Sequence, residues 1–168
     1  MIVRKSTNND LPSIMKIIHE AQQYLASQNI DQWQDGYPDE AMILNDIAKK
    51  ESFVVLHENQ VIATYVLSVN GDENYDNIEG DWLTDNLTKY GVIHRIAVSA
   101  SNTKKGIAKY IILECEKQLK SQGIISMRMD THKDNKGMQH ILKTSGYSYC
   151  GIINLKRGGS RVAFEKLV

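Results

Sequence analysis

Cysteine, proline and phenylalanine are scarce in this chain of 168 residues, with two of each, and the formal net charge is zero. Cys115 and Cys150 are too few for a disulfide framework, and no C-x-x-C pair suggests a metal or redox site. A neutral chain has no global attraction for nucleic acid. No apolar run is long enough to span a membrane, and the start, MIVRKSTNND, has no signal-peptide apolar region. We therefore expect a cytoplasmic protein with no metal, nucleic-acid or membrane partner.

The most informative stretch, residues 92–122, reads as a strand, a turn and a helix. Residues 92–98 are rich in β-branched side chains, which predicts a strand whose apolar run is interrupted only by His94 and Arg95. The second half of the stretch has apolar residues at the spacing of one helical face, namely Ala108, Ile111, Ile112, Cys115 and Leu119. Gly123 is expected to end this helix in the left-handed conformation.

The turn before that helix combines a glycine with lysines at positions 104, 105 and 109. The first amides of a helix have no intrahelical acceptor, and the helix dipole adds positive potential at the same end. With Gly106 at the helix start, such a turn suits a pyrophosphate. Many turns of this composition bind nothing, however, and this one is neither G-x-x-x-x-G-K-[ST] nor G-x-G-x-x-G.

The remaining patterns predict one α/β domain with a mixed sheet. Strands are expected at 2–5, 52–57, 60–69, 92–98, 124–130, 147–155 and 161–167, and helices around 12–25, 39–50, 106–122 and 135–145. A helix connects the strands 92–98 and 124–130, so these two should be parallel neighbours. The two residues after position 57 predict a hairpin turn. The polar connection 71–89 is expected to hold only a short helix around Trp82.

The strand, turn and helix resemble the acyl-CoA-binding motif of the GNAT superfamily of N-acetyltransferases. The family's loop, Q/R-x-x-G-x-G/A, aligns with the six residues from Thr103 to Ala108, where Thr103 replaces the usual Gln or Arg. A second family-like segment begins at Asp130 and holds Asn135, an amphipathic helix and Gly146-Tyr147 in place of the family's Gly-Phe. The resemblance covers nearly the whole chain, and it is specific for the superfamily but not for a substrate.

The resemblance implies the GNAT fold, an α/β (α+β) fold with a mostly antiparallel mixed sheet and a splayed parallel pair of central strands, formed by a single domain over residues 1–168. It implies acetyl-CoA as the co-substrate, lying where the parallel strands splay, with an N–H near Ile96 polarising the thioester carbonyl. The residues that it assigns to acetyl-CoA are Ile96, Ala97, Val98, Thr103, Lys104, Lys105, Gly106, Ile107, Ala108, Lys109 and Asn135.

Three residues are candidates for proton transfer: His94, His132 and Tyr147. On a regular strand His94 would point to the same side as Ile96, and an imidazole can take a proton from an amine at working pH. His94 reads equally well as a half-buried strand residue, and Arg95 as a structural ion-pair partner. The position of the family's general-acid tyrosine is here Leu142, so Tyr147 is a nearby hydroxyl, although packing explains it equally well.

Aromatic and acidic residues are the candidates for the acceptor side. Trp33, Tyr37 and Trp82 either line a substrate pocket or pack against the domain's edge. The connection 71–89 carries six carboxylates against one lysine, which favours a cationic acceptor, or is simply a solvated charged run.

The predicted function is therefore N-acetyl transfer from acetyl-CoA to a primary amine of a small molecule or peptide. A non-catalytic acyl-CoA sensor is the alternative, and a phosphate binder unrelated to CoA is a third reading. A homodimer is compatible with the sequence.

Overall fold

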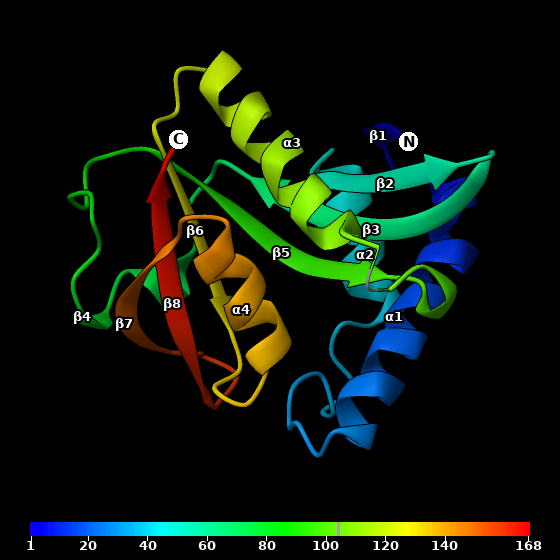
Figure 1. Ribbon diagram of the computed structural model, residues 1–168, viewed down its shortest axis with the longest axis horizontal. Helices are drawn as coiled ribbons and strands as arrows, with labels where there is room; N and C mark the ends of the chain where they lie inside the picture. Colours follow the sequence, from blue (N-terminus) through cyan, green and yellow to red (C-terminus); the bar gives the residue numbers. More distant parts are fainter. Residues whose placement is uncertain (104) are drawn as a thin grey trace. The chain divides into compact units, whose positions relative to one another are not determined.

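The computed structural model describes residues 1–103 and 105–168, which form two compact units. The first unit consists of Met1–Leu67 and His94–Ile111, and the second of Ser68–Ile93 and Ile112–Val168. Strand β5 (Tyr90–Val98) and helix α3 (Ile107–Ser121) each contribute residues to both units (Figure 1).

Antiparallel strands form the sheet of the first unit. Strand β1 (Ile2–Lys5) pairs with β2 (Ser52–His57), and β2 pairs with β3 (Gln60–Ser68). The turn between β2 and β3 consists of Glu58 and Asn59, whose φ angles are 49° and 62°. A tight hairpin turn of type I′ requires two left-handed residues, so the predicted two-residue hairpin is confirmed.

Two helices pack on this sheet, α1 (Leu11–Ser27) and α2 (Glu40–Ala48). Helix α2 begins after Asp39, whose carboxylate accepts the N–H of Met42 at 2.8 Å, as its capping residue type predicts. The core of the unit consists of Ile14, Ile18, Ile43 and Val54. The helical spacing in the predicted helix 12–25 is confirmed, because Ile14, Ile17, Ile18 and Leu25 are the buried residues of α1.

Five strands succeed one another in the sheet of the second unit in the order β5-β6-β8-β7-β4. The further bounds are β4 (Ile78–Gly80), β6 (Ser126–Thr131), β7 (Ser148–Asn154) and β8 (Ser160–Leu167). Strands β5 and β6 are parallel, with Tyr90 opposite Ser126 and Val92 opposite Arg128, whereas β6–β8, β8–β7 and β7–β4 are antiparallel. The predicted parallel pair and the mixed, mostly antiparallel sheet are confirmed.

Strand β4 lies in the connection for which we expected only a short helix around Trp82, and that prediction is wrong. A Cβ on Gly80 would lie 2.2 Å from the carbonyl oxygen of Cys150, and one on Gly151 would lie 2.2 Å from that of Glu79. Glycine on both strands therefore permits β4 and β7 to approach. Three residues are too few for an alternating pattern to reveal a strand in the sequence.

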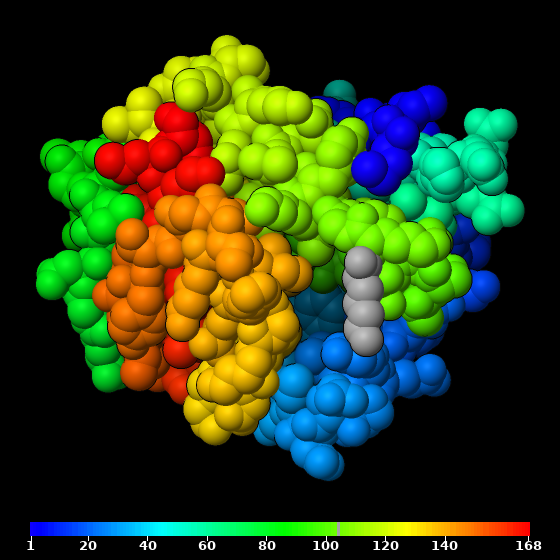
Figure 2. All heavy atoms as spheres, viewed as in Figure 1, coloured from blue at the N-terminus to red at the C-terminus, as the bar shows by residue number. Residues whose placement is uncertain are grey.

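Helices cover the sheet of the second unit. The second part of α3 buries Cys115 completely, as its apolar spacing predicts, and Gly123 follows the helix with φ 71°. Helix α4 (Lys136–Thr144) contacts β7, and its outer face is exposed on the near side of the molecule in Figure 2. One part of the core consists of Tyr75, Val92, Ile153 and Ala163.

Within residues 1–103 and 105–168, no helix combines the length and the apolar character of a membrane span. The same residues contain no group of three or more His, Cys, Asp or Glu side chains placed to hold a metal ion.

Candidate functional site

The turn that leads from β5 into α3 leaves backbone amides available to a ligand. Gly106 has φ 75°, and its carbonyl accepts the N–H of Tyr110 at 2.9 Å, so helical hydrogen bonding starts at this residue. The amides of Ile107, Ala108 and Lys109 follow in the first helical turn, where no intrahelical acceptor is in reach. Apart from chain neighbours, no described heavy atom lies within 4 Å of the position that a Cβ on Gly106 would take. The turn therefore has room for a group that accepts these hydrogen bonds.

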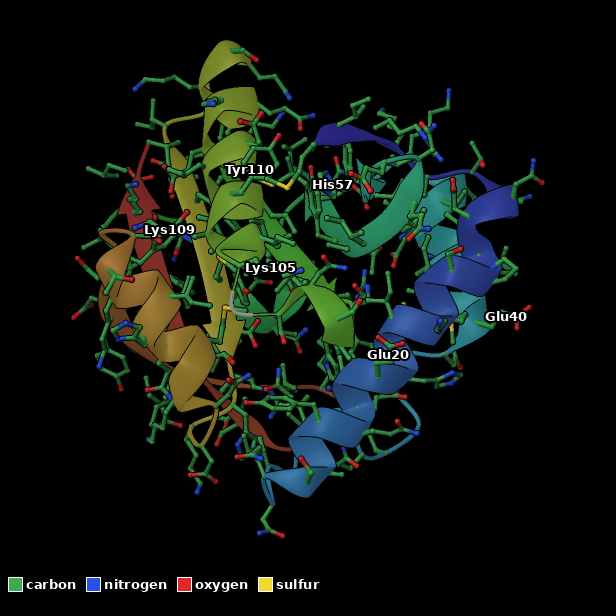
Figure 3. All side chains as sticks on the ribbon, turned by 45° about the vertical axis from the view of Figure 1, so that its right-hand side comes forward. Glu20, Glu40, His57, Lys105, Lys109 and Tyr110 are labelled. Atoms are coloured by element: carbon green, nitrogen blue, oxygen red, sulfur yellow. The ribbon has the colours of Figure 1, made fainter. Side chains whose placement is uncertain are left out.

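Positive charge gathers at the same end of the helix. Lys105 and Lys109 are exposed, and Figure 3 shows both at the start of α3. The ammonium of Lys105 donates to the side-chain oxygen of Asn102 at 3.2 Å. Together with the positive end of the helix dipole, these charges suit a phosphate or pyrophosphate. Lys104, which we also assigned to the ligand, lies outside the described residues.

The side chain of Thr103 bonds to the backbone of the segment before this turn. Its hydroxyl donates to the carbonyl of Ala100 at 3.1 Å, which closes the single 3₁₀ turn Ala100–Asn102. Thr103, which replaces the usual Gln or Arg of the loop pattern, therefore bonds to the backbone of the preceding turn.

The segment before the turn is held in place by its neighbours in the first unit. The N–H of Ala100 donates to the carboxylate of Glu20 at 2.8 Å, and the N–H of Ser99 donates to the carbonyl of Ile62 at 2.9 Å. The amide of Asn102 donates to the hydroxyls of Ser99 and Ser101. These bonds fix the approach to Gly106 without help from a ligand.

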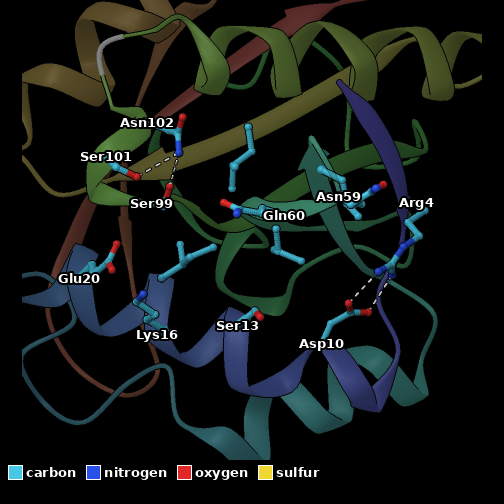
Figure 4. A pocket seen from close by; sticks show the side chains of 14 residues that line it. Arg4, Asp10, Ser13, Lys16, Glu20, Asn59, Gln60, Ser99, Ser101 and Asn102 are labelled. Carbon is cyan, nitrogen blue, oxygen red and sulfur yellow. Dashed lines mark hydrogen bonds and ion pairs between the residues drawn. The ribbon is translucent and has the colours of Figure 1, made fainter.

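A polar groove of about 510 Å³ adjoins this segment, lined by α1, the start of β3 and residues 99–102 (Figure 4). Arg4 and Asp10 form part of its wall, through two hydrogen bonds of 2.7 and 2.8 Å. The bond from Arg4 lowers the pKa of Asp10 to about 2, so this wall carries a fixed ion pair. Lys16 and Glu20 add one charge of each sign.

The second part of β5 carries the first candidate base, His94, which is half-buried. The next residue, Arg95, has φ 51°, a left-handed conformation inside a strand. Its guanidinium donates to the carboxylate of Asp46 at 2.8 Å and to the hydroxyl of Tyr37 at 2.6 Å. The predicted ion-pair role of Arg95 is confirmed. The left-handed residue interrupts the regular alternation on which we relied to place His94 and Ile96 on one side of the strand.

The candidate acceptor residues of the first unit lie on the connection between α1 and α2. Trp33 and Tyr37 are both half-buried there. The amide of Gln22 on α1 donates to the carbonyl of Tyr37 at 3.1 Å, and the amide of Gln34 donates to the carbonyl of Gln22 at 3.0 Å. The connection is thus bonded to α1, and Tyr37 is also bonded to Arg95.

Two candidates of the second unit, His132 and Asn135, follow strand β6. The Nδ1 of His132 accepts the N–H of Asp134 at 3.2 Å, so a neutral imidazole carries its proton on Nε2. The side-chain oxygen of Asn135 accepts the N–H of Met138 at 3.1 Å and thereby caps α4. The side chain that the resemblance assigns to the cofactor therefore also starts this helix.

Tyr147 is enclosed rather than presented to solvent. Its hydroxyl donates to Glu116 at 3.0 Å, and the ammonium of Lys166 donates to the other oxygen of Glu116 at 2.8 Å. Burial, together with the carboxylate of Glu116, raises the pKa of Tyr147 far above its ordinary value. A phenol in this state is a poor acid, so the geometry favours the packing interpretation. Leu142, at the position of the family's tyrosine, is fully buried.

Trp82 packs on a buried arginine that sequence analysis missed. The indole N–H donates to the carbonyl of Tyr75 at 3.1 Å, and its ring lies 4.3 Å from the guanidinium carbon of Arg128. Arg128 also donates to Glu165 at 3.2 Å, and both charged residues are at most 1% exposed. The two stand opposite each other on β6 and β8. The sequence signal for this pair was the presence of charged residues of opposite sign within two apolar strands. That signal identifies a pair only when the register of the two strands is known.

Comparisons with known proteins agree on one family. The model of the Acetyltransferase (GNAT) family matches residues 18–147. A GNAT-family acetyltransferase from Streptococcus agalactiae is 34% identical with a TM-score of 0.89, covering 99% of this chain and 95% of that one. The PaiA N-acetyltransferase of Thermoplasma acidophilum, solved in complex with coenzyme A, is 19% identical with a TM-score of 0.72, covering 99% and 98%. No curated protein sequence gives a significant match.

Proposed function

Because this chain belongs to the GNAT family of acetyltransferases, we propose that it transfers the acetyl group of acetyl-CoA to a primary amine of a small molecule or peptide. The observation that carries the proposal is the start of α3. There, Gly106 leaves open space beside the amides of the first helical turn, and exposed lysines flank it. The PaiA structure, which has a similar fold, was solved with coenzyme A and supports the same co-substrate.

The proposed acetyl-CoA contacts follow from the chemistry of each segment. The amides of residues 107–109 bind the pyrophosphate, and Lys105 and Lys109, with Lys104 and Thr103, surround it. Backbone groups of Ile96 to Val98 pair with the pantetheine arm, to which Asn135 also contributes. Acetyl-CoA supplies an activated thioester. Thiols are fairly acidic, with a pKa of about 8.5 for a free cysteine side chain, so a thiolate leaving group needs less acid assistance than an amine would.

The proposed reaction needs no covalent enzyme intermediate. The amine nitrogen attacks the thioester carbonyl, the C–S bond breaks, and the proton lost by the amine passes to His94, directly or through water. The N–H of Ile96 stabilises the negative charge that develops on the carbonyl oxygen. Water returns a proton to the thiolate, and His132 is the second candidate for the base. Positioning of the two reactants supplies much of the rate.

For the acceptor side, we propose a cationic amine bound near Trp33 and Tyr37. The acidic connection 71–89 raises the local concentration of such an amine. We further propose that residues 1–168 form one catalytic domain of a cytoplasmic protein that is able to form a homodimer.

An assay of acetyl-CoA consumption with a panel of primary amines tests the proposal. Wild type should consume acetyl-CoA with at least one amine, and His94→Ala should lower kcat by more than about tenfold, because a general base typically contributes about 10²–10⁴-fold. His140→Ala is the matched control, because His140 is an exposed histidine on α4 and should leave kcat unchanged. Binding of acetyl-CoA without consumption would favour the sensor, and absence of binding would exclude both readings.

A further inference from the structure

The backbone conformation of Arg95 is unusual for its residue type. Its φ of 51° lies in the left-handed region, within strand β5, where neighbouring residues are extended. Glycine, asparagine and aspartate enter this region readily, whereas a long side chain does so only when its surroundings stabilise it. Something in the first unit must therefore hold residue 95 in this conformation.

The side chain of Arg95 forms contacts that hold the backbone in this conformation. One end nitrogen donates to Asp46 on α2 at 2.8 Å, and the other donates to Tyr37, on the connection before α2, at 2.6 Å. The guanidinium carbon also lies 5.9 Å from the centre of the Tyr37 ring. The Arg95 side chain is 11% exposed and that of Asp46 is 4% exposed, so these bonds are sheltered from water. The strand is thus fixed to two separate segments.

The arrangement is not one that maximises stability. The Nε of Arg95 and the second carboxylate oxygen of Asp46 are buried, and neither finds a hydrogen-bond partner in the described part of the chain. A buried ion pair with unmet hydrogen bonds contributes little to stability, because desolvation offsets the attraction. The left-handed backbone of the same arginine adds a further unfavourable contribution. Two unfavourable features at one residue point to a function for its geometry.

We propose that Arg95 is a positioning residue, whose clamp on Asp46 and Tyr37 holds the left-handed backbone at residue 95 and so orients the N–H of Ile96 toward the thioester carbonyl. The inference rests on the proposed function, because it gives that N–H its task. Rotation of φ at Arg95 toward an extended value swings the following peptide group, including this N–H. Through Tyr37, the same clamp ties the strand to the connection proposed for the acceptor.

Two double variants separate the backbone effect from the loss of the guanidinium. Both carry Asp46→Asn, which avoids an unpaired buried carboxylate, and they differ only in Arg95→Gly or Arg95→Ala. Glycine accepts the left-handed conformation without a steric penalty, whereas alanine does not. We expect kcat of the alanine variant to be at least about tenfold below that of the glycine variant, because a misplaced oxyanion donor is costly. The dissociation constant for acetyl-CoA should agree within about threefold, since the pyrophosphate turn is unaltered.

Crystal structures of both variants give a readout that does not depend on turnover. Residue 95 should keep a positive φ as glycine and become extended as alanine. Equal kcat values in the two variants, or a left-handed alanine, would overturn the inference. An inactive wild type with the expected difference in φ would instead contradict the proposed function and leave the clamp in place. Thermal unfolding of the two variants checks that both are folded at the assay temperature.

Discussion

Among the described residues, both units contain a buried arginine–carboxylate pair, Arg95–Asp46 in the first and Arg128–Glu165 in the second, and the two pairs are built differently. In the second unit, Glu165 accepts from Arg128, from the hydroxyls of Ser126 and Thr84, and from the backbone N–H of Leu83. Arg128 lies between two aromatic rings, 4.3 Å from Trp82 and 4.0 Å from Tyr90. In the first unit, Arg95 and Asp46 share one hydrogen bond, and each keeps a buried polar atom without a described partner.

The pKa shifts of the two carboxyls have opposite signs. Burial alone would raise the pKa of Glu165, but the bonds from Ser126 and Thr84 and the charge of Arg128 outweigh it and lower the pKa. Burial raises the pKa of Asp46, and Arg95 only partly opposes it. The network around Arg128 and Glu165 stabilises the fold. The pair of Arg95 and Asp46 instead holds a backbone conformation and contributes little to stability. Because of this difference, we infer a positioning role in catalysis for Arg95 and a stabilising role in the fold for Arg128.

Glu165→Gln should have the largest effect on stability. Removal of this charge leaves Arg128 buried and uncompensated, which typically lowers the free energy of unfolding by about 3–5 kcal/mol. Asp46→Asn should lower it by less than half as much, because folding already disfavours the charged form of Asp46. Urea unfolding of both variants measures the two values. Equal losses would contradict the distinction between the pairs.

Glu165 and Asp46 should contribute to the pH dependence of the free energy of unfolding with opposite signs. The lowered pKa of Glu165 contributes stability that is present above its unfolded value of about 4.3 and disappears as pH falls through the folded pKa. The raised pKa of Asp46 does the opposite, so stability is lost as pH rises from about 3.9 through its folded pKa. Lowering the pH should therefore reduce the difference in free energy of unfolding by which wild type exceeds Glu165→Gln. It should raise the free energy of unfolding of wild type relative to that of Asp46→Asn. Urea unfolding at a series of pH values from about 3 to 7, which lie on both sides of the two unfolded pKa values, measures the slopes, and slopes of the same sign would refute the assignment.

Tyr147→Phe removes a third buried polar group. The hydroxyl of Tyr147 has one well-placed acceptor, Glu116, which also binds Lys166. Its loss should lower the free energy of unfolding by about 1–2 kcal/mol and kcat by less than about tenfold. Tyr149→Phe is the matched control, since Tyr149 is 56% exposed, and it should change neither value appreciably. A hundredfold loss of kcat in Tyr147→Phe, with acetyl-CoA affinity intact, would instead make this tyrosine the general acid.

Surface charge should give the smallest effect. Asp76 and Asp81 are exposed on the acidic connection, and their joint change to Asn should raise KM for a cationic amine by a few-fold and weaken its salt dependence. Asp85 is a poorer choice, because its carboxylate accepts from the amides of Leu87 and Thr88 and holds their turn. An unchanged KM and salt dependence would leave the connection without a role in acceptor binding.

The sequence predicted those features that depend on local pattern. The glycine turn, the α3 face and the two-residue hairpin could be read directly, because period and turn residues determine them. The left-handed conformation of Arg95 could not, since arginine gives no signal for it and the partners Tyr37 and Asp46 are distant in the chain. The Arg128–Glu165 pair depends in the same way on strand register, which one sequence does not reveal.

Acetyl-CoA binding at the start of α3 is the prediction on which the proposed function rests, and two glycines provide a matched test of it. Gly106 and Gly123 flank the same helix with φ 75° and 71°, and a Cβ on either would have no described heavy atom within 4 Å apart from its chain neighbours. Gly106→Glu and Gly123→Glu therefore carry the same backbone penalty, but only Gly106→Glu places negative charge where the pyrophosphate would bind. Calorimetric titration with acetyl-CoA should show binding by wild type and by Gly123→Glu, and at least about a hundredfold weaker binding by Gly106→Glu. Equal affinity in the two variants would place the phosphates elsewhere and contradict the account.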